Sequence, residues 1–576
     1  MEPKATDKFL ANGSTAEKEP PNESDVTDII GEYGPWQRLI FILTCLRGTP
    51  TAFYNLSTPF FAPKQQDAWC AMPPGLNWSV AQWRNSAIPM EMKEGQLVPS
   101  RCRMFEIVSI EGEPAVDVSR AVDCHAWEYD NSFYTNTLTD EYDLVCDRDW
   151  LISFTQFNYM FGMMCGVFIF GHLADRFGRR IILNLSVTLM LVSSVMTAFS
   201  PSFIYFSIGR FFLALGVAGT QNTSFCLLME VLGPIYRTRV TFAFSFGWCF
   251  GLLLLPGMTY FIRDWVYQQL ASALVSSILL SYWVFMPESP RWLMTQGKYE
   301  QAEKVMIAAA KKNKLEIKNM PVVMKQLKER IEREERKKNP SVIDLFKTAN
   351  LRKNTIFVYI SYFSVAFVFY GLSLGQTNLG GNPFLSFFIG SAVELPAYFL
   401  CIIFIRYLRR KPSFLIFNII GGLACFFMMP SDYQWLRLTA AMLGKLCISG
   451  AFIILAIHAA EIFPTVVRTV GSGTSLMMGR IGAMTAPFVK ELGNATHPAV
   501  PAIVYGSLSI VAAVLIALLP ETYNQTLPDT IYEAEGLGNG QNPSETDIED
   551  SPKNKNDVQM KTFKSRKDSN DCEVQI

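Results

Sequence analysis

Apolar stretches long enough to cross a bilayer recur along this chain of 576 residues. Half of the residues are hydrophobic and 13% are aromatic, and a helix needs about 20 apolar residues to cross the hydrocarbon core of a membrane. Inside that core only helices and closed barrels satisfy all of their own backbone groups. The sequence therefore predicts an all-α membrane protein. Its twelve transmembrane helices are expected over 37–60, 150–173, 181–199, 203–229, 238–261, 267–286, 354–374, 384–406, 413–430, 436–459, 469–491 and 501–520.

Charge assigns the segments between these helices to two sides of the membrane. The linker 287–353 is rich in Lys and Arg, which is typical of a cytoplasmic loop, whereas the loop 61–149 is predominantly acidic. We expect this loop to be extracellular and both tails, 1–32 and 521–576, to be cytoplasmic in a multi-pass protein of the plasma membrane. Short amphipathic helices are expected in the linker. The net charge of zero argues against a nucleic-acid partner.

The outer loop and the C-terminal tail carry signals of their own. Two disulfides are expected in the loop, with three possible pairings, because an even number of cysteines lies in an oxidising compartment. These cysteines are Cys70, Cys102, Cys124 and Cys146. Asn77-Trp78-Ser79 is a glycosylation acceptor. The polar tail is expected to be mostly disordered, and its end, Val574-Gln575-Ile576, is a candidate ligand for a PDZ domain.

Two motifs occur once in each half of the chain. Glu230 to Arg237 at the end of the fourth span matches Glu461 to Arg468 at the end of the tenth, and Pro287-Glu288-Ser289 matches Pro520-Glu521-Thr522. Such repeats indicate two six-helix bundles related by an axis along the membrane normal, with a substrate site between them near the midplane. The bundles are expected over 33–286 and 354–520.

Further motifs name a family. They are Gly171 to Arg180, Pro287 to Trp292, Ala392 to Tyr398, Glu461 to Arg468, and Pro520 to Thr522 with Leu527 to Asp529. Together they resemble solute carrier family 22 of the major facilitator superfamily, which contains organic cation, organic anion and carnitine/zwitterion transporters. The resemblance runs from about Tyr33 to Ile531 and implies alternating access, in which two bundles rock about a central site.

The resemblance also implies charge pairs on the cytoplasmic face that stabilise the outward-open state. The matching residues are Asp175, Arg176, Arg179, Glu230, Arg237, Glu461 and Arg468. In the second half, Ile405 to Arg410 lacks both the Asp and the Gly of the motif. We therefore expect the second set of pairs to be weaker or differently built.

Ionisable residues inside the membrane point to the substrate site, because each costs at least about 2.5–3.5 kcal/mol and is retained for function or for a partner. They are Arg47, Arg210, Glu394, Lys445 and Arg480. Glu394 and Arg480 together suit a zwitterion, with its ammonium near the acid and its carboxylate on the guanidinium. A salt bridge between these two residues that binds nothing is the alternative. Arg210 and Lys445 are expected at equivalent places in the two repeats, in structural or coupling roles. A cavity lined by Arg47 would favour an organic anion.

Aromatic rings could hold a quaternary ammonium, at about 0.5–2 kcal/mol per contact. The resemblance places Tyr370 at a substrate-contacting position and Tyr398 where anion-selective members have a lysine. Phe244 and Trp248 lie one turn apart on the fifth span. Thr220-Gln221 replaces an Asn-Tyr pair associated with sodium in the carnitine branch, which leaves coupling to Na⁺ or H⁺ open. Neither metal-ligand nor nucleophile spacing occurs, so we expect no cofactor, no metal and no enzyme activity.

These patterns predict a polyspecific organic ion transporter. Its expected substrates are zwitterionic or cationic small molecules such as carnitine-like quaternary ammonium compounds. Two alternatives stay open, namely an organic anion transporter and a non-transporting sensor or scaffold of the same fold.

Overall fold

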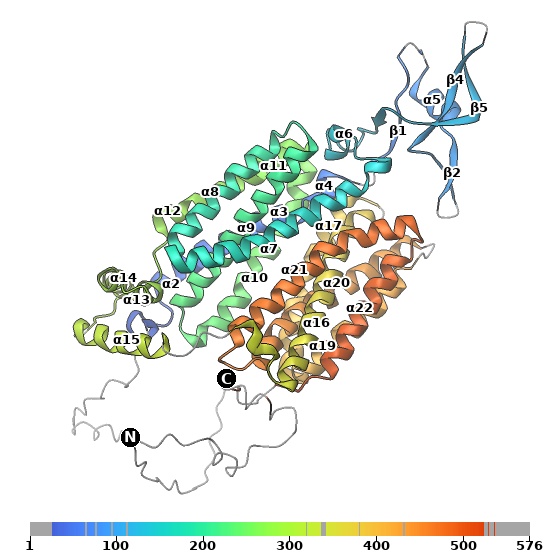
Figure 1. The fold of residues 1–576 in the computed structure, drawn as a ribbon. Coiled ribbons are helices and arrows are strands. Elements are labelled where there is room, and N and C mark those ends of the chain that lie inside the picture. The colour runs from blue at the N-terminus through green and yellow to red at the C-terminus, as the bar shows by residue number, and fades with distance from the viewer. Residues whose placement is uncertain are drawn as a thin grey trace, which may run out of the picture.

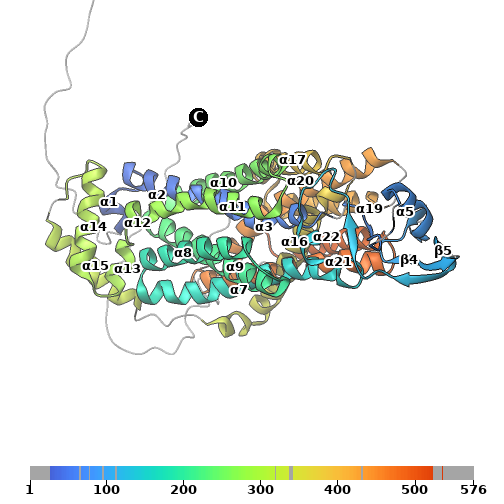
Figure 2. The same ribbon diagram turned by 90° about the horizontal axis from the view of Figure 1, so that it is seen from above.

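The structure is a computed structural model that describes residues 26–522 apart from 64–65, 75, 77, 94–95, 111–112, 318, 336–340, 380 and 430–432, together with residues 528 and 535. Its membrane part consists of two bundles of long helices that lie side by side (Figure 1). The cysteine-bearing loop projects from one end, and the linker helices cover the opposite end of the first bundle (Figures 1 and 2). We call these ends the loop side and the linker side.

The first bundle is built from the N-terminal half of the chain. Its helices are α2 (Pro35–Leu46), α3 (Gly48–Leu56), α4 (Thr58–Phe61), α7 (Trp150–Phe177), α8 (Arg179–Ala198), α9 (Phe203–Val231), α10 (Pro234–Phe261), α11 (Trp265–Ser276), the 3-10 helix η2 (Ser277–Ser281) and α12 (Tyr282–Phe285). The short helix α1 (Val26–Ile30) precedes them. The linker contributes α13 (Pro290–Thr295), α14 (Tyr299–Lys312), α15 (Met320–Glu335) and η3 (Val342–Phe346).

The second bundle follows the linker. Its helices are α16 (Ala349–Gly375), η4 (Gln376–Asn378), α17 (Pro383–Ala392), α18 (Glu394–Leu408), α19 (Arg410–Phe427), α20 (Gln434–Ile462), α21 (Arg468–Ala495) and α22 (Val500–Ala517). Each of the twelve expected spans falls on one of these helices or on a run of consecutive ones. By length and apolar composition alone, eight helices of the described residues are candidates to cross a membrane.

Three expected spans are interrupted: the sixth divides into α11, η2 and α12, and proline explains the breaks in the first and the eighth. The first span is interrupted after Leu46 and the eighth after Ala392. Each break lies four residues before a proline, Pro50 or Pro396. Proline has no N–H to donate to the carbonyl four residues earlier, and its ring crowds that carbonyl.

The loop between α4 and α7 contains strands, which the sequence did not predict. Three antiparallel pairs form, β1 (Ala68–Cys70) with β6 (Trp127–Tyr129), β2 (Met90–Lys93) with β3 (Gln96–Pro99), and β4 (Arg103–Ile110) with β5 (Glu113–Asp123). The loop also holds α5 (Val80–Ala87), α6 (Leu138–Tyr142) and η1 (Cys146–Arg148).

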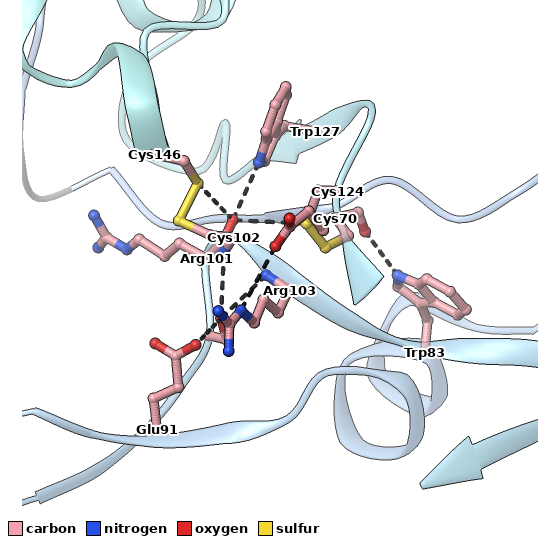
Figure 3. Close-up of a disulfide and its surroundings, with 11 residues drawn as sticks. Cys70, Trp83, Glu91, Arg101, Cys102, Arg103, Cys124, Trp127 and Cys146 are labelled. Atoms are coloured by element: carbon pink, nitrogen blue, oxygen red, sulfur yellow. Dashed lines mark hydrogen bonds and ion pairs between the residues drawn. A yellow bond between two sulfur atoms is a disulfide. The ribbon is translucent and has the colours of Figure 1, made fainter. Parts of the chain in front are cut away.

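Both expected disulfides form, and the structure selects one of the three pairings. Cys70 pairs with Cys124, and Cys102 pairs with Cys146 (Figure 3). The buried Trp83 indole donates to the Cys70 carbonyl at 2.8 Å, so this ring packs under the first disulfide (Figure 3). The expected glycosylation site Asn77 and the tail end 574–576 lie outside the described residues.

The loop is attached to the first bundle through its last third. The Trp265 indole at the start of α11 donates to the Glu141 carboxylate at 2.7 Å, and the Tyr142 hydroxyl donates to the Ser200 carbonyl at 2.8 Å. Asn136 pairs with Asp264 as an isolated parallel bridge. These contacts fix the last third of the loop to the first bundle.

A single residue, Gly178, joins α7 to α8. Its φ of 110° and ψ of 153° lie in a region that is essentially limited to glycine. A Cβ atom at this position would lie 2.6 Å from the Glu288 Oε2 atom and 3.0 Å from the Trp292 ring. The turn needs glycine for its backbone angles and also for space.

We predict that Gly178→Ala destabilises the protein by more than the about 1–3 kcal/mol expected for backbone strain alone, because the added methyl also collides with Glu288. Gly297→Ala is the matched control, since Gly297 also has a positive φ, of 69°, but nothing lies within 4 Å of the point that its Cβ would occupy. Thermal unfolding of both variants in detergent checks this, and equal losses of melting temperature would contradict it.

Candidate functional site

The first charge cluster, Asp175, Arg179, Glu230 and Glu288, lies on the linker side of the first bundle. Arg179 forms ion pairs of 2.8 Å with Asp175 and 2.8 Å with Glu230, and so connects α7, α8 and α9. The Glu288 carboxylate accepts the backbone N–H groups of Arg179 at 2.8 Å and Arg180 at 3.2 Å. An acid at a helix start satisfies otherwise unpaired N–H groups. Burial raises the pKa of Glu288 above its usual value, and the N–H groups oppose this rise.

The second charge cluster, Arg410, Glu461, Glu521 and Thr522, repeats this arrangement in the second bundle. The Arg410 guanidinium lies 2.9 Å from the Glu461 carboxylate. Arg410 and Glu461 are 51 positions apart in the sequence, as are Arg179 and Glu230. Glu521 accepts the N–H of Lys411 at 3.1 Å, and the Thr522 hydroxyl donates to Glu461 at 2.6 Å. The second set keeps the ion pair between arginine and glutamate and the acid at the helix start, so a loss of these pairs is not seen. It is differently built, as expected, because the equivalents of Asp175 and Gly178 are missing.

The turn before α19 is made without glycine. Arg409 takes the place of Gly178, with φ of 67° and ψ of −177°. This region costs a non-glycine residue about 1–3 kcal/mol. The second cluster thus holds a strained residue where the first uses glycine.

Three of the arginines expected in charge pairs make contacts of another kind. The Arg237 guanidinium donates to the Leu232 carbonyl at 3.1 Å and that of Arg468 to the Phe463 carbonyl at 3.2 Å, so both satisfy carbonyls at helix ends. Arg176 lies over the Phe177 ring at 5.5 Å. At Glu230 the cation is Arg179, and the ring contact of Arg176 differs from the acid pair expected for it.

Glu394 is paired with lysine. The Lys445 Nζ atom lies 3.1 Å from the Glu394 Oε1 atom, with exposed side-chain fractions of 1% and 0%. The alternative of a Glu394–Arg480 salt bridge is therefore wrong for this conformation. Arg210 precedes Glu230 by 20 residues, whereas Lys445 precedes Glu461 by 16, so the two cations lie about one turn apart in the repeats rather than at equivalent places.

Arg480 is half-buried, and its neighbours are aromatic hydroxyls. Its guanidinium lies 3.5 Å from the Tyr370 hydroxyl, and in the described part of the chain no carboxylate lies within ion-pair distance of it. Tyr370 interacts electrostatically with both Arg480 and Glu394, and Tyr159 interacts with both Arg480 and Arg210. The four groups around Arg480 therefore share one region of the membrane part.

Arg210 and Arg47 are buried in the first bundle. Arg210 donates to the hydroxyls of Thr58 at 3.0 Å and Ser57 at 3.4 Å, and lies 4.8 Å from the centre of the Tyr159 ring. Arg47, 2% exposed at the break between α2 and α3, interacts with Cys45 and Tyr282. These contacts are structural in kind.

The expected aromatic residues gather only in part. The Trp248 indole and Tyr398 are electrostatic neighbours of Glu394, and Tyr370 lies between Glu394 and Arg480. The Phe244 side chain lies outside the described part of the chain. Three of the four expected rings thus lie near Glu394, and one of them, Tyr370, also lies near Arg480.

A cluster of aromatic rings closes the seam between the bundles on the loop side. The Phe384 ring of α17 stacks on Phe60 of α4 at 5.6 Å and on Phe133 of the loop at 5.6 Å. Tyr260 of α10 meets Phe384 edge-on at 5.6 Å, and Tyr134 lies 6.1 Å away. A ring of the second bundle is therefore inserted among rings of the first bundle and its loop.

Further contacts continue this seam. Ser153 of α7 donates to Glu491 of α21 at 2.9 Å, and Phe157 meets Phe488 edge-on at 5.8 Å. Near mid-membrane, Phe246 of α10 lies 6.1 Å from Phe399 of α18. Contacts between the bundles thus run from mid-membrane to the loop side, and the molecule is closed there.

Sequence reasoning missed Lys445 as the partner of Glu394, Arg410 as the partner of Glu461, and the Phe384 contacts. The second pair has a signal in the sequence, because arginine and glutamate recur at the 51-residue separation of Arg179 and Glu230. Nothing local indicates the other two, which depend on helices far apart in the chain.

We predict that Arg410→Gln lowers thermal stability and substrate uptake as much as Arg179→Gln does, because each leaves a mostly buried glutamate without its cation at a cost of about 1–3 kcal/mol. Arg406→Gln, at an exposed arginine one turn earlier, is the control and should change neither. A stable, active Arg410→Gln protein would show that the second charge cluster is dispensable.

We predict that Phe384→Ala shifts the protein toward a state open on the loop side, because burial of a phenylalanine ring contributes up to about 3–5 kcal/mol to the closed one. An impermeant maleimide applied from the loop side should label a cysteine introduced at Ile152, on the seam, faster in this variant. Leu385→Ala, at an exposed neighbour on the same helix, should leave the rate unchanged. Equal rates in both variants would refute the gating role of Phe384.

The chain is similar to known transporters in sequence and in fold. The family described as "Sugar (and other) transporter" matches residues 119–532. The chain is similar to the organic cation/carnitine transporter 2 of Homo sapiens, with 33% identity over 91% of this chain and 96% of that protein. It is also similar to the organic cation transporter protein of Drosophila melanogaster, at 33% over 91% and 96%, and to solute carrier family 22 member 21 of Mus musculus, at 34% over 88% and 92%.

Among solved structures, the partially occluded inward-open form of the xylose transporter XylE from E. coli matches with a TM-score of 0.56 at 17% identity, covering 85% of this chain and 98% of that one. At this identity the match supports the two-bundle fold and nothing finer. The family match and the relatives confirm the resemblance noted in the sequence. The chain belongs to the major facilitator superfamily and, within it, to solute carrier family 22.

Proposed function

We propose that this transporter carries zwitterionic organic ions, such as quaternary ammonium carboxylates of the carnitine kind, by alternating access between its two bundles. The single observation that carries the proposal is Arg480, a half-buried guanidinium without a carboxylate partner in the described residues. A planar guanidinium binds a carboxylate through two parallel hydrogen bonds. A carboxylate-bearing substrate supplies the missing partner.

The residues around Glu394 suit the ammonium group of the proposed substrate. Trp248, Tyr398 and Tyr370 neighbour this carboxylate, and aromatic faces hold a quaternary ammonium at about 0.5–2 kcal/mol per contact. Lys445 already neutralises Glu394 in this conformation. A substrate ammonium there is thus bound by the rings and shares the carboxylate with Lys445. Two relatives, the human and mouse organic cation/carnitine transporters, carry names that fit this class of substrate.

The proposal places the loop side outside the cell and the linker side in the cytoplasm of the plasma membrane. Two disulfides suit an oxidising compartment, and the linker is rich in Lys and Arg. Both tails are then cytoplasmic. The charge clusters keep each bundle rigid while the contacts around Phe384 open and close the outer face.

An organic anion is the second candidate, because Arg210 and Arg480 both interact with Tyr159 and no acid neutralises either one in the described residues. An anion would use the same Arg480 guanidinium but would gain nothing from the rings near Glu394. The two candidates therefore differ in their dependence on Trp248 and Tyr398.

We predict that Arg480→Ala raises the KM for carnitine uptake about 10- to 150-fold, since a hydrogen-bonded charge contributes about 1.5–3 kcal/mol. Uptake of tetraethylammonium, which lacks a carboxylate, should not fall. Arg352→Ala, at an exposed arginine of α16, is the control. Trp248→Leu should also weaken carnitine uptake, because it removes a ring beside Glu394.

Uptake by proteoliposomes that contain the purified chain provides the measurement. Carnitine uptake that is indifferent to Arg480 would overturn the assignment of the carboxylate. Uptake of benzoate in place of carnitine would favour the anion candidate. Absence of uptake of all three compounds, in protein that is folded, would favour a sensor or scaffold.

A further inference from the structure

Lys445 and Glu394 form an ion pair that is sealed from solvent inside the second bundle. Glu394 is the first residue of α18 and Lys445 lies in α20, and the exposed fractions of their side chains are 0% and 1%. The Lys445 Nζ atom lies 3.1 Å from the carboxylate and 5.9 Å from the centre of the Phe387 ring. In the described residues neither side chain makes a second ion pair. Lys445 therefore compensates Glu394 before a substrate arrives.

The pair borders the site that is proposed for the substrate. Trp248 of α10 and Tyr370 of α16 are neighbours of Glu394, and Tyr370 also interacts with Arg480. Around these rings one acid, Glu394, lies with two bases, Lys445 and Arg480. The site without substrate therefore has an excess of positive charge.

This excess acts differently on different classes of substrate. A simple organic cation adds another positive charge, whereas a zwitterion adds no net charge and brings a carboxylate to Arg480. Like charges repel more strongly in an interior of low dielectric constant than in water. Arg210, which interacts with Tyr159 as Arg480 does, adds to the repulsion. Specificity in proteins often depends on a repulsive element of this kind.

Lys445 is the residue on which this repulsion depends most directly. Without its charge, Glu394 would be an acid with no lysine beside it, and a simple cation could pair with it. We infer that Lys445 determines the specificity of the site by disfavouring organic cations that lack a carboxylate. This role rests on the proposed function, because that function places the substrate between Glu394 and Arg480.

Uptake of tetraethylammonium and of carnitine by proteoliposomes that contain the full-length chain measures this specificity. Lys445→Gln should raise the ratio of tetraethylammonium uptake to carnitine uptake at least about tenfold, because it removes a like charge from the site. Lys445→Arg should keep the ratio of the unaltered chain. Glu394→Gln/Lys445→Gln should gain no tetraethylammonium uptake, because the gain requires the acid. Lys353→Gln, at an exposed lysine of α16, is the control and should leave the ratio unchanged.

Thermal unfolding in lipid nanodiscs tests the same pair without transport. Lys445→Ala leaves Glu394 buried without its cation, which destabilises a protein strongly. Methylammonium is small enough to replace the lost ammonium group, and a ligand that binds only the folded state stabilises it. It should therefore raise the melting temperature of Lys445→Ala saturably. It should have no such effect on the unaltered chain or on Glu394→Gln/Lys445→Ala.

The two proposals can fail separately. Carnitine uptake by the unaltered chain tests the proposed function, whereas the gain of tetraethylammonium uptake tests the role of Lys445. An unchanged uptake ratio in folded Lys445→Gln would overturn that role, and so would a Lys445→Ala protein that methylammonium does not stabilise. A gain of equal size in Glu394→Gln/Lys445→Gln would also overturn it, because the effect would then be independent of Glu394.

Discussion

A charged side chain inside a bilayer needs a partner of opposite charge or access to water, because its transfer into hydrocarbon costs at least about 2.5–3.5 kcal/mol. The ionisable residues of the membrane part meet this requirement in different ways. Lys445 neutralises Glu394, and Arg210 is surrounded by hydroxyls and rings. Arg480 lies beside the Tyr370 hydroxyl, and no carboxylate lies within ion-pair distance of it in the described residues. Arg480 is therefore the charge that the proposed function assigns to the carboxylate of the substrate.

The same constraint keeps each bundle rigid on the linker side. Arg179 and Arg410 each link the start of one helix to a glutamate near the end of another, and Glu288 and Glu521 satisfy the N–H groups at those helix starts. All of these contacts lie within one bundle. Contacts between the bundles are instead mainly between aromatic rings, such as Phe384 with Phe60 and Phe157 with Phe488. We therefore expect the two bundles to move relative to each other at the seam, with little change inside either bundle.

Much of the fold could be predicted from the sequence, because apolar length and proline chemistry are local signals. The twelve spans fall on helices, and Pro50 and Pro396 explain the unanticipated breaks in the first and eighth spans. The pairing of Cys70 with Cys124 could not be predicted, since it depends on how the strands of the loop meet.

The candidate site was only partly predictable for the same reason. Glu394 and Arg480 are recognisable as membrane charges, but which cation reaches Glu394 depends on the packing of α18 against α20. The absent Asp and Gly at Ile405 to Arg410 suggested a weaker or differently built second cluster. A motif shows which residues are missing, but it does not show which pair remains. Arg409 adopts the glycine-like turn, and Arg410 still reaches Glu461.

Distances between spin labels test the central claim, that two rigid bundles rock about the seam around Arg480. One pair, at Phe177 and Arg406, spans the linker side, and a second, at Phe199 and Trp435, spans the loop side. Adding carnitine should change these two distance distributions in opposite directions. The distance from 177 to 199, within the first bundle, should stay fixed. Two distances between the bundles that change together, or a change within the first bundle, would contradict the account.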